Sequence, residues 1–214
     1  IIEKLMDLKE DGSFRLDMSY FNYATGLTMT NKKFSNLFGH PVRDSQKDLL
    51  TQFHMDIAAS IQSVTEEIIL RITSSLAKEY KIENLCLAGG VALNCVANGK
   101  ILKKNIFKEI WMQPAAGDAG GSLGAALAFW YKEFGNKRIV HADQMKGSYL
   151  GPSFSNDHIK NELNLLNANF TYLSEEELIK EVANKISKEK TVGWFQGRME
   201  FGPRALGCRS IVAD

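Results

Sequence analysis

Apolar residues recur every three or four positions between Asp44 and Tyr80, the spacing that places side chains on one stripe of an α-helix. The stripe consists of Leu50, Phe53, Ile57, Ile61, Val64, Ile68, Ile72 and Leu76. The pattern predicts one long helix that begins near Asp44 or Ser45 and ends near Tyr80. His54 and Asp56 should then lie near its middle, partly buried, and we interpret them as satisfied polar residues at the stripe's edge, with ligand contact as the alternative.

The chain before this helix shows weaker patterns. Residues 12–23 are rich in aromatics and partly alternate between apolar and polar, which is typical of one or two strands. Residues 25–41 are mostly polar, and Pro41 should end any regular element there. We expect a loop with a short helix in that stretch.

After Tyr80, short apolar runs alternate with helical patterns, and a glycine-rich turn follows each run. The predicted order is a buried strand at 84–88, a helix at 91–104, a second strand at 109–113 and a further helix that contains Leu123 and Phe129. This alternation predicts an α/β layer architecture with largely parallel strands. Cys86, Cys95, Trp111 and Trp130 are expected core residues.

The pattern changes between Gly135 and Phe154, where glycines are frequent and periodic apolar positions are few. We therefore place a domain boundary near residue 147, with domains at 1–147 and 148–214. The second domain should contain a helix from Ser155 to about Leu166 and strands at 169–173 and 191–195. Ser174 and Glu177 have capping-box spacing, which predicts another helix reaching about Ser187.

Composition excludes several classes of protein. The 214 residues are 44% hydrophobic and 24% charged, as in folded globular chains, and the net charge of +1 provides no broad field for nucleic acid or an anionic membrane. Three cysteines without a CxxC pair indicate a reducing compartment, and no apolar run approaches the roughly 20 residues of a membrane span. We expect a cytoplasmic protein with neither nucleic acid nor membrane as partner.

The two glycine turns are candidate phosphate sites. Exposed N–H groups at a helix start favour phosphate, and glycine lets a ligand approach the backbone closely. Neither turn matches a Walker or a GxGxxG pattern, so a tight strand-to-helix connection is the alternative for each. The candidate residues are Gly89 and Gly90 in the first turn and Gly117, Gly120 and Gly121 in the second.

Asp118 lies inside the second turn, where a carboxylate would repel a phosphate unless a divalent cation bridges the two. The alternative is that Asp118 caps the following helix. The four histidines show no one-turn spacing that would make a metal pair, so any metal would find only part of its ligands here.

Three arginines follow the last predicted strand, in a loop that also contains glycines and a proline. Arg198, Arg204 and Arg209 could converge on an oxyanion, because a guanidinium binds phosphate or carboxylate through two hydrogen bonds. The alternative is three solvated arginines in a surface loop.

Taken together, the motifs resemble the O-carbamoyltransferases of the NodU/CmcH type. The resemblance extends from Phe14 onward and is most specific in the last of four segments, which are residues 54–62, 87–99, 114–126 and 193–207. It implies an actin-like (ASKHA, Kae1-like) fold, of which residues 1–147 would be the second lobe. Residues 148–214 would be the truncated start of a YrdC-like carbamoyltransferase C-terminal domain.

The resemblance also implies a reaction, in which carbamoyl phosphate and ATP give carbamoyl-adenylate and the carbamoyl group then passes to an acceptor hydroxyl, commonly on a sugar. Asp118 would hold a divalent metal such as iron or manganese. The residues near the nucleotide would be Gly89, Gly90, Asn94, Gly117, Gly120 and Gly121. Those on the carbamoyl-phosphate side would be Arg198, Arg204 and Arg209.

The chain departs from the family pattern in two respects. Cys208 stands where the family usually has Asn, and the expected metal histidines, in an HxxxH pattern, do not occur in this sequence. We therefore expect the segment alone to be inactive. The competing hypotheses are an actin-like kinase or threonylcarbamoyl-type transferase, and a nucleotide- and metal-binding module without carbamoyl chemistry.

Overall fold

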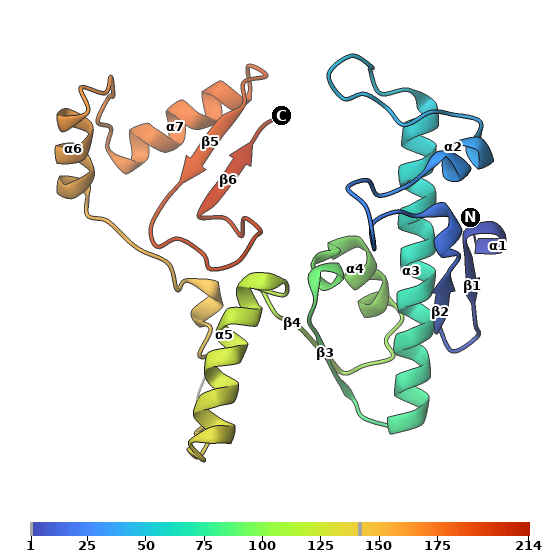
Figure 1. The fold of residues 1–214 in the computed structure, drawn as a ribbon. Coiled ribbons are helices and arrows are strands. Elements are labelled where there is room, and N and C mark those ends of the chain that lie inside the picture. The colour runs from blue at the N-terminus through green and yellow to red at the C-terminus, as the bar shows by residue number, and fades with distance from the viewer. Residues whose placement is uncertain (1, 141–142) are drawn as a thin grey trace. The chain divides into compact units, whose positions relative to one another are not determined.

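The computed structural model describes residues 2–140 and 143–214, and the chain divides into two compact units. The first unit comprises Ile1–Cys86 and Asn94–Trp111, and the second comprises Leu87–Leu93 and Met112–Asp214 (Figure 1). Each unit mixes helices with short strands, which is consistent with the expected α/β class.

The first unit begins with helix α1 (Ile2–Leu5) and an antiparallel hairpin of β1 (Met6–Leu8) and β2 (Phe14–Leu16). Gly12 in the hairpin turn has φ of +88°, and a Cβ there would overlap Ile72 of the long helix, so the hairpin lies directly against that helix. A strand was predicted within residues 12–23, and β2 confirms it. Helix α2 (Lys32–Phe38) confirms the short helix predicted in the following loop.

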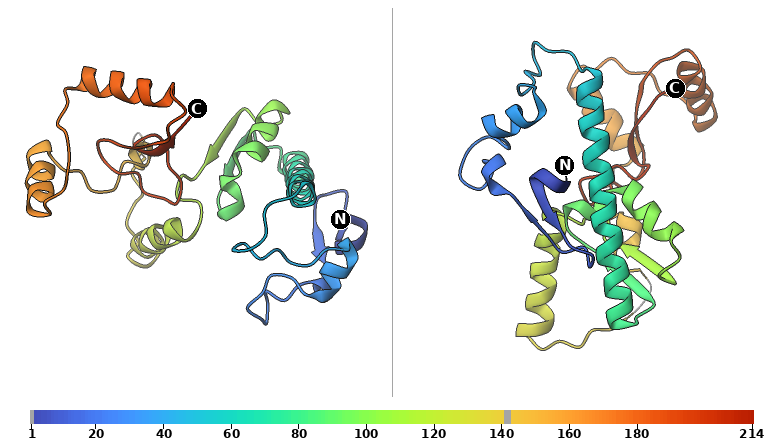
Figure 2. Two further views of the ribbon diagram at one scale, coloured as in Figure 1. Left: turned by 90° about the horizontal axis from the view of Figure 1, so that it is seen from above. Right: turned by 90° about the vertical axis from the view of Figure 1, so that its right-hand side faces the viewer.

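Helix α3 (Gln52–Tyr80) is the longest element of the first unit and runs vertically in Figure 1 and in the right-hand view of Figure 2. Its end agrees with the prediction, but the predicted start near Asp44 is wrong. The side chain of Asp48 accepts a hydrogen bond from the Asp44 N–H at 2.8 Å and holds a turn there. The helix instead begins at a capping box formed by Thr51 and His54.

Because α3 begins later than predicted, His54 and Asp56 lie near its start and not near its middle. His54 lies in the first turn, where its Nδ1 accepts a hydrogen bond from the Thr51 N–H at 3.0 Å. Asp56 is exposed and accepts a hydrogen bond from Gln52 Nε2 at 2.8 Å. Their interpretation as satisfied polar residues is confirmed, but their predicted position was wrong, and so was the predicted partial burial of Asp56.

Helix α4 (Cys95–Lys103) packs against α3, and Ala97 and Ile101 of α4 are buried, as is Ile68 of α3. A polar network links the same two helices. Glu66 is 6% exposed, pairs with Lys100 and accepts a hydrogen bond from Gln62 Nε2 at 2.8 Å. The hydrogen bonds from Lys100 and Gln62 hold the pKa of Glu66 below its ordinary value.

Strands β3 (Asn84–Leu87) and β4 (Glu109–Met112) pair side by side, and both cross the division between the units. Lys108 N donates to Glu83 O at 2.7 Å and Gln113 N donates to Leu87 O at 3.1 Å. From the first of these bonds to the second, the donor and the acceptor both lie further towards the C-terminus, so the strands are parallel, as predicted. The predicted helix at 91–104 is shorter, because a 3₁₀ turn (Gly90–Leu93) precedes α4.

The predicted burial of four residues is wrong. Cys86, Cys95, Trp111 and Trp130 are all exposed. Cys86 and Trp111 lie on the parallel sheet, which has only two strands among the described residues and is too small to be covered on both faces.

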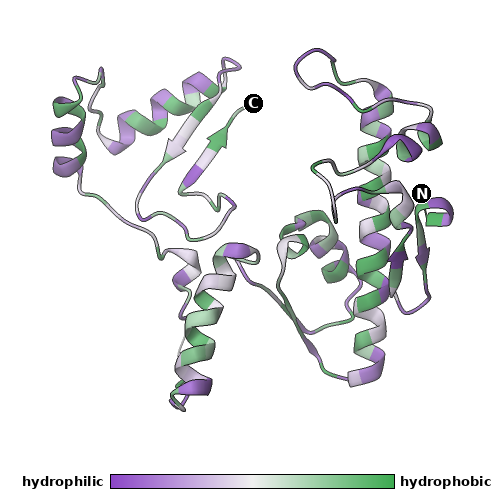
Figure 3. Cartoon of the chain, in the orientation of Figure 1, coloured by the Kyte–Doolittle hydropathy of each residue, from purple (hydrophilic) through white to green (hydrophobic). Residues whose placement is uncertain are grey.

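In the second unit, helix α5 (Asp118–Ala128) is largely apolar and continues into a π-helical turn (Phe129–Glu133). Helices α6 (Asn156–Leu165) and α7 (Glu175–Ile186) begin at the predicted caps Ser155 and Ser174. Hydrophobic and hydrophilic residues alternate along α7, which contacts strand β5 (Figure 3).

Strands β5 (Val192–Phe195) and β6 (Arg209–Val212) form an antiparallel pair, which confirms the predicted strand at 191–195. The predicted strand at 169–173 is wrong. Helix α6 ends at Leu165, Asn167 beyond its cap has φ of +51°, and the residues that follow pair with no strand in the described parts of the chain.

Candidate functional site

Both glycine turns and the arginine loop, which connects β5 to β6, meet at the segment Pro114–Ala116 within the second unit. Gly89 N donates to Ala116 O at 2.7 Å. A Cβ on Gly202 would lie 2.9 Å from Pro114 O, so this part of the loop touches the start of the second glycine turn. The structure therefore brings together three motifs that are spread over more than one hundred residues of the sequence, from Gly89 to Gly202 (Figure 1).

The first glycine turn has one conformationally demanding position. Gly89 has φ of +96°, in the left-handed region that favours glycine, and its N–H is used by Ala116. Gly90 has no atom within 4 Å of the place where a side chain would begin. Gly90 therefore leaves space that a ligand could fill, whereas Gly89 shapes the turn.

The second glycine turn leads into α5, whose N-cap residue is Gly117 and receives no side-chain hydrogen bond. A Cβ on Gly120 would overlap the carbonyl oxygen of Ala115, so Gly120 is required for the packing of the helix against its own turn. Gly117 and Gly121 face open space. The N–H groups of Gly120 and Gly121 donate to Gly117 O at 3.1 and 3.2 Å, so the uncapped helix start offers an anion the N–H groups of Asp118 and Ala119 and the positive dipole end.

Asp118 is the first residue of α5 and is exposed, so the interpretation as a helix cap is wrong, because Gly117 occupies the cap position. No hydrogen bond or ion pair to its carboxylate is formed by any residue in the described part of the chain. Across the same residues no group of three or more His, Cys, Asp or Glu side chains could hold a metal ion. Asp118 fits the role of a single metal ligand, and the remaining ligands would have to come from elsewhere.

Asn94 lies in the first unit, whereas the glycine turns lie in the second. Its Oδ1 caps α4 by accepting from Ala97 N at 3.1 Å, and its Nδ2 donates to Gln62 Oε1 at 2.8 Å. Both polar atoms of the amide are therefore in use within the first unit.

Glu200, at the start of the arginine loop, is the most deeply buried charged residue of the second unit, with 1% of its surface exposed. Its Oε1 accepts hydrogen bonds from the N–H groups of Leu206 at 3.0 Å and Cys208 at 2.7 Å. Its Oε2 lies 3.6 Å from Nε of Arg209. Burial alone would raise the pKa of Glu200, but these hydrogen bonds and the Arg209 charge outweigh burial and lower it.

The three arginines differ in how free their guanidinium groups are. Arg209 is half-buried, faces Glu200, and donates from Nη2 to the carbonyl oxygens of Gly202 and Arg204. Arg198 is exposed and donates from Nη1 to Gly151 O at 2.6 Å. Arg204 is exposed, and its guanidinium has no hydrogen bond or ion pair with any residue that the structure describes.

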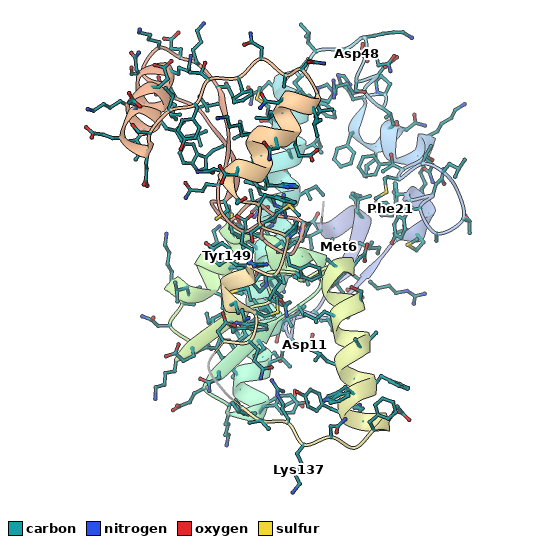
Figure 4. All side chains as sticks on the ribbon, turned by 90° about the vertical axis from the view of Figure 1, so that its left-hand side faces the viewer. Met6, Asp11, Phe21, Asp48, Lys137 and Tyr149 are labelled. Carbon is teal, nitrogen blue, oxygen red and sulfur yellow. The ribbon has the colours of Figure 1, made fainter. Side chains whose placement is uncertain are left out.

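The segment Ser148–Gly151 forms hydrogen bonds with the backbone of the arginine loop. Ser148 is fully buried, has φ of +76° and donates from Oγ to Phe201 O at 2.6 Å. Its main-chain carbonyl oxygen accepts a hydrogen bond from Phe201 N at 2.7 Å. Gly151 N donates to Met199 O at 2.9 Å. Tyr149, labelled in Figure 4, lies beside Cys208, and the hydrogen bond between them raises the pKa of Tyr149.

Sequence reasoning missed Glu200 and Ser148 as residues that organise the site. The only signal for Glu200 was a charged residue between Met199 and Phe201 in a segment otherwise rich in glycine. Nothing in the sequence pattern marked Ser148, whose partner Phe201 is 53 residues away.

Two family models match the chain. The model described as carbamoyltransferase N-terminus covers residues 1–127, and the model described as carbamoyltransferase C-terminus covers residues 183–214. Our domain boundary near residue 147 falls between these ranges and stays a prediction.

Several relatives align with most of the chain. A Synechocystis protein of uncharacterised function is 58% identical over all of this chain and 35% of its own length. The nodulation protein NolNO of Sinorhizobium fredii is 40% identical over all of this chain and 29% of its own. NolO of Bradyrhizobium diazoefficiens is 41% identical over 77% of this chain and 30% of its own.

The chain thus spans about a third of the length of the relatives it matches. None of the helices in the described residues is long and apolar enough to cross a membrane.

Proposed function

Since the chain belongs to the carbamoyltransferase family, we propose that the full-length protein activates carbamoyl phosphate with ATP to carbamoyl-adenylate. The carbamoyl group then passes to an acceptor hydroxyl, such as that of a sugar. The observation that carries the proposal is the contact between Gly202 of the arginine loop and Pro114 of the second glycine turn. This contact would bring an arginine-rich anion site next to a helix start suited to nucleotide phosphate.

The nucleotide side of the site consists of the turns that precede the 3₁₀ turn and α5. Gly90, Gly117 and Gly121 leave open space beside their backbone, and the N-terminus of α5 has no side-chain cap. A phosphate could therefore accept hydrogen bonds from main-chain N–H groups that no cap competes for. We assign ATP to this side.

The metal side depends on Asp118, whose exposed carboxylate is adjacent to the same helix start. A divalent cation held there, such as iron or manganese, would neutralise charge on phosphoryl oxygens. Asp118 would supply one ligand, and the other ligands would come from residues outside the described part of this chain.

The carbamoyl-phosphate side is the arginine loop. Among the described residues, Arg204 has no partner on either edge of its guanidinium, and Arg198 is engaged on the edge that faces Gly151. A guanidinium that binds the phosphate through two hydrogen bonds neutralises the leaving group and so favours attack of water at the carbamoyl carbon, which releases phosphate and forms carbamate. The carbamate oxygen would then attack the α-phosphorus of ATP, which releases pyrophosphate and forms carbamoyl-adenylate.

The two predicted domains enter the proposal as the second lobe of an actin-like fold, at 1–147, and the start of a YrdC-like domain, at 148–214. Because the chain covers only about a third of its relatives, we propose that it is inactive by itself. Carbamoyl transfer catalysed by the isolated 214-residue chain would contradict this part of the proposal.

The experiment that separates the candidate functions is identification of the adenylate. The full-length protein is incubated with ATP and a divalent metal, and with either carbamoyl phosphate or threonine plus bicarbonate, and the products are identified by mass spectrometry. We expect carbamoyl-adenylate from the first mixture only. Threonylcarbamoyl-adenylate from the second would favour the tRNA-modification type of transferase, and ATP binding with no adenylate would favour a nucleotide-binding module.

A further inference from the structure

The carboxylate of Glu200 and the guanidinium of Arg209 stabilise the conformation of the arginine loop. Glu200 accepts the N–H groups of Leu206 and Cys208, at the far end of the loop. Arg209 lies against Glu200 and donates to the carbonyl oxygens of Gly202 and Arg204, in the middle of the loop. These contacts connect the start, the middle and the end of the loop through two buried or half-buried charges.

The hydrogen bonds of Arg209 leave it poorly suited to bind an anion directly. A guanidinium binds an oxyanion through two parallel N–H donors on one edge. One such edge of Arg209 consists of Nε and Nη2 and the other of Nη1 and Nη2, so both include Nη2, which is engaged here. Nη2 of Arg209 faces two carbonyl oxygens, and its Nε faces Glu200 at 3.6 Å. Arg204 has no such engagement among the described residues, and its own carbonyl oxygen is one of the two that Arg209 holds.

We propose that Glu200 and Arg209 are positioning residues, which fix the backbone of the loop so that the guanidinium of Arg204 is presented to the anion. The inference rests on the proposed function and deepens it. It adds Glu200 to the site and moves Arg209 from direct contact with carbamoyl phosphate to support of the residue that makes it.

The burial of Glu200 supports this assignment. A carboxylate with 1% of its surface exposed is costly to keep charged unless it is paired, and Oε2 of Glu200 has no hydrogen-bond partner in the described structure apart from the nearby charge of Arg209. Removing either partner leaves the other charge uncompensated. The two residues should therefore act as one unit.

The test measures how single and paired substitutions change the steady-state kinetics of the full-length protein. Glu200→Gln keeps an acceptor for the two N–H groups but removes the charge opposite Arg209. Arg209→Lys keeps a charge but cannot bridge the two carbonyl oxygens and Glu200. Glu175→Gln, exposed on α7 in the same unit, is the matched control.

We expect each single substitution to raise KM for carbamoyl phosphate about 10- to 100-fold, as when residues that orient a metal's ligands are lost. KM for ATP should stay unchanged. KM for carbamoyl phosphate in the double variant should not exceed that of the more impaired single variant, because the effects of interacting residues are not additive. A rise of both KM values together, additive effects, or kinetics like those of Glu175→Gln would overturn the proposal.

A second measurement does not depend on turnover. Amide hydrogen exchange at Leu206 and Cys208 should be slow in the wild type and faster in Glu200→Ala, which removes their acceptor. Equal exchange in the two proteins would overturn the positioning role. Absence of carbamoyl-phosphate turnover in the wild type would instead remove the proposed function, so the two failures are distinguishable.

Discussion

Gly120 packs so closely against the carbonyl oxygen of Ala115 that any side chain there would overlap it. The next glycine, Gly121, has open space at its own Cβ position, as does Gly124. The two adjacent glycines of the predicted phosphate turn therefore differ: a side chain at Gly120 would clash with the protein itself, whereas a side chain at Gly121 would occupy space that a ligand could fill.

This difference makes a matched set of alanine substitutions informative. Gly120→Ala should destabilise the protein by about 1–3 kcal/mol, the usual range for overpacking. Gly121→Ala should fold normally but bind ATP more weakly, because the new methyl group fills the space beside the helix start. Gly124→Ala is the control, and it should gain up to about 1 kcal/mol of helix stability with unchanged ATP binding.

The measurements are thermal unfolding and ATP titration on the three variants. Normal stability of Gly120→Ala would show that α5 can move away from its turn. Wild-type ATP affinity of Gly121→Ala would remove this glycine from the nucleotide site.

Asp118 should contribute to metal binding and little to folding. Its carboxylate is exposed and does not cap α5, so Asp118→Asn should leave the unfolding temperature nearly unchanged while the bound metal of the full-length protein is lost. Metal content measured by elemental analysis, with Asp157→Asn in the first turn of α6 as control, checks this. Retention of metal by Asp118→Asn would show that this carboxylate is not a ligand.

Arg204→Lys should raise KM for carbamoyl phosphate about tenfold, the equivalent of one charge-assisted hydrogen bond lost when a planar fork becomes a point charge. Stability should not change, because the Arg204 guanidinium has no partner among the described residues. Arg138→Lys, exposed and outside the loop, is the control. Identical kinetics for the two variants would return Arg204 to the class of solvated surface arginines.

Acid should weaken the contact between α3 and α4. The pKa of Glu66 is lower in the folded state than its ordinary value of 4.5, because of Lys100 and Gln62, so protonation favours the unfolded state. The stabilisation is present above pH 4.5 and is lost as pH falls through the folded-state pKa.

The midpoint of urea unfolding, followed by circular dichroism from neutral pH to below the pKa of Glu66, measures this effect. Glu66→Gln should flatten the acid side of the profile, and Glu79→Gln, exposed on the same helix, controls for removal of a charge. An acid profile of Glu66→Gln that matches the wild type would show that the pair with Lys100 adds no pH-dependent stability.

Local patterns predicted most of the elements, because caps and periodicity act over one or two turns. The caps at Ser155 and Ser174, the end of α3 at Tyr80 and the strand 192–195 all followed from such patterns. The start of α3 did not, because the side chain of Asp48 competes with the helix for backbone N–H groups.

The site was predictable in its motifs but not in its connections. The glycine turns and the arginine loop stood out as residue patterns, whereas the contact of Gly202 with Pro114 depends on the tertiary structure. Arg204 and Arg209 look equivalent in sequence, and only the burial of Glu200 distinguishes their environments. The expected burial of Trp111 and Trp130 failed for the same reason, since burial depends on what covers a surface.

The most direct test of the central claim is release of pyrophosphate from ATP by the full-length protein, measured with and without carbamoyl phosphate and with and without added divalent metal. We expect release that requires carbamoyl phosphate and increases with metal. Release that is independent of carbamoyl phosphate, or no release from a folded and metal-loaded protein, would contradict it.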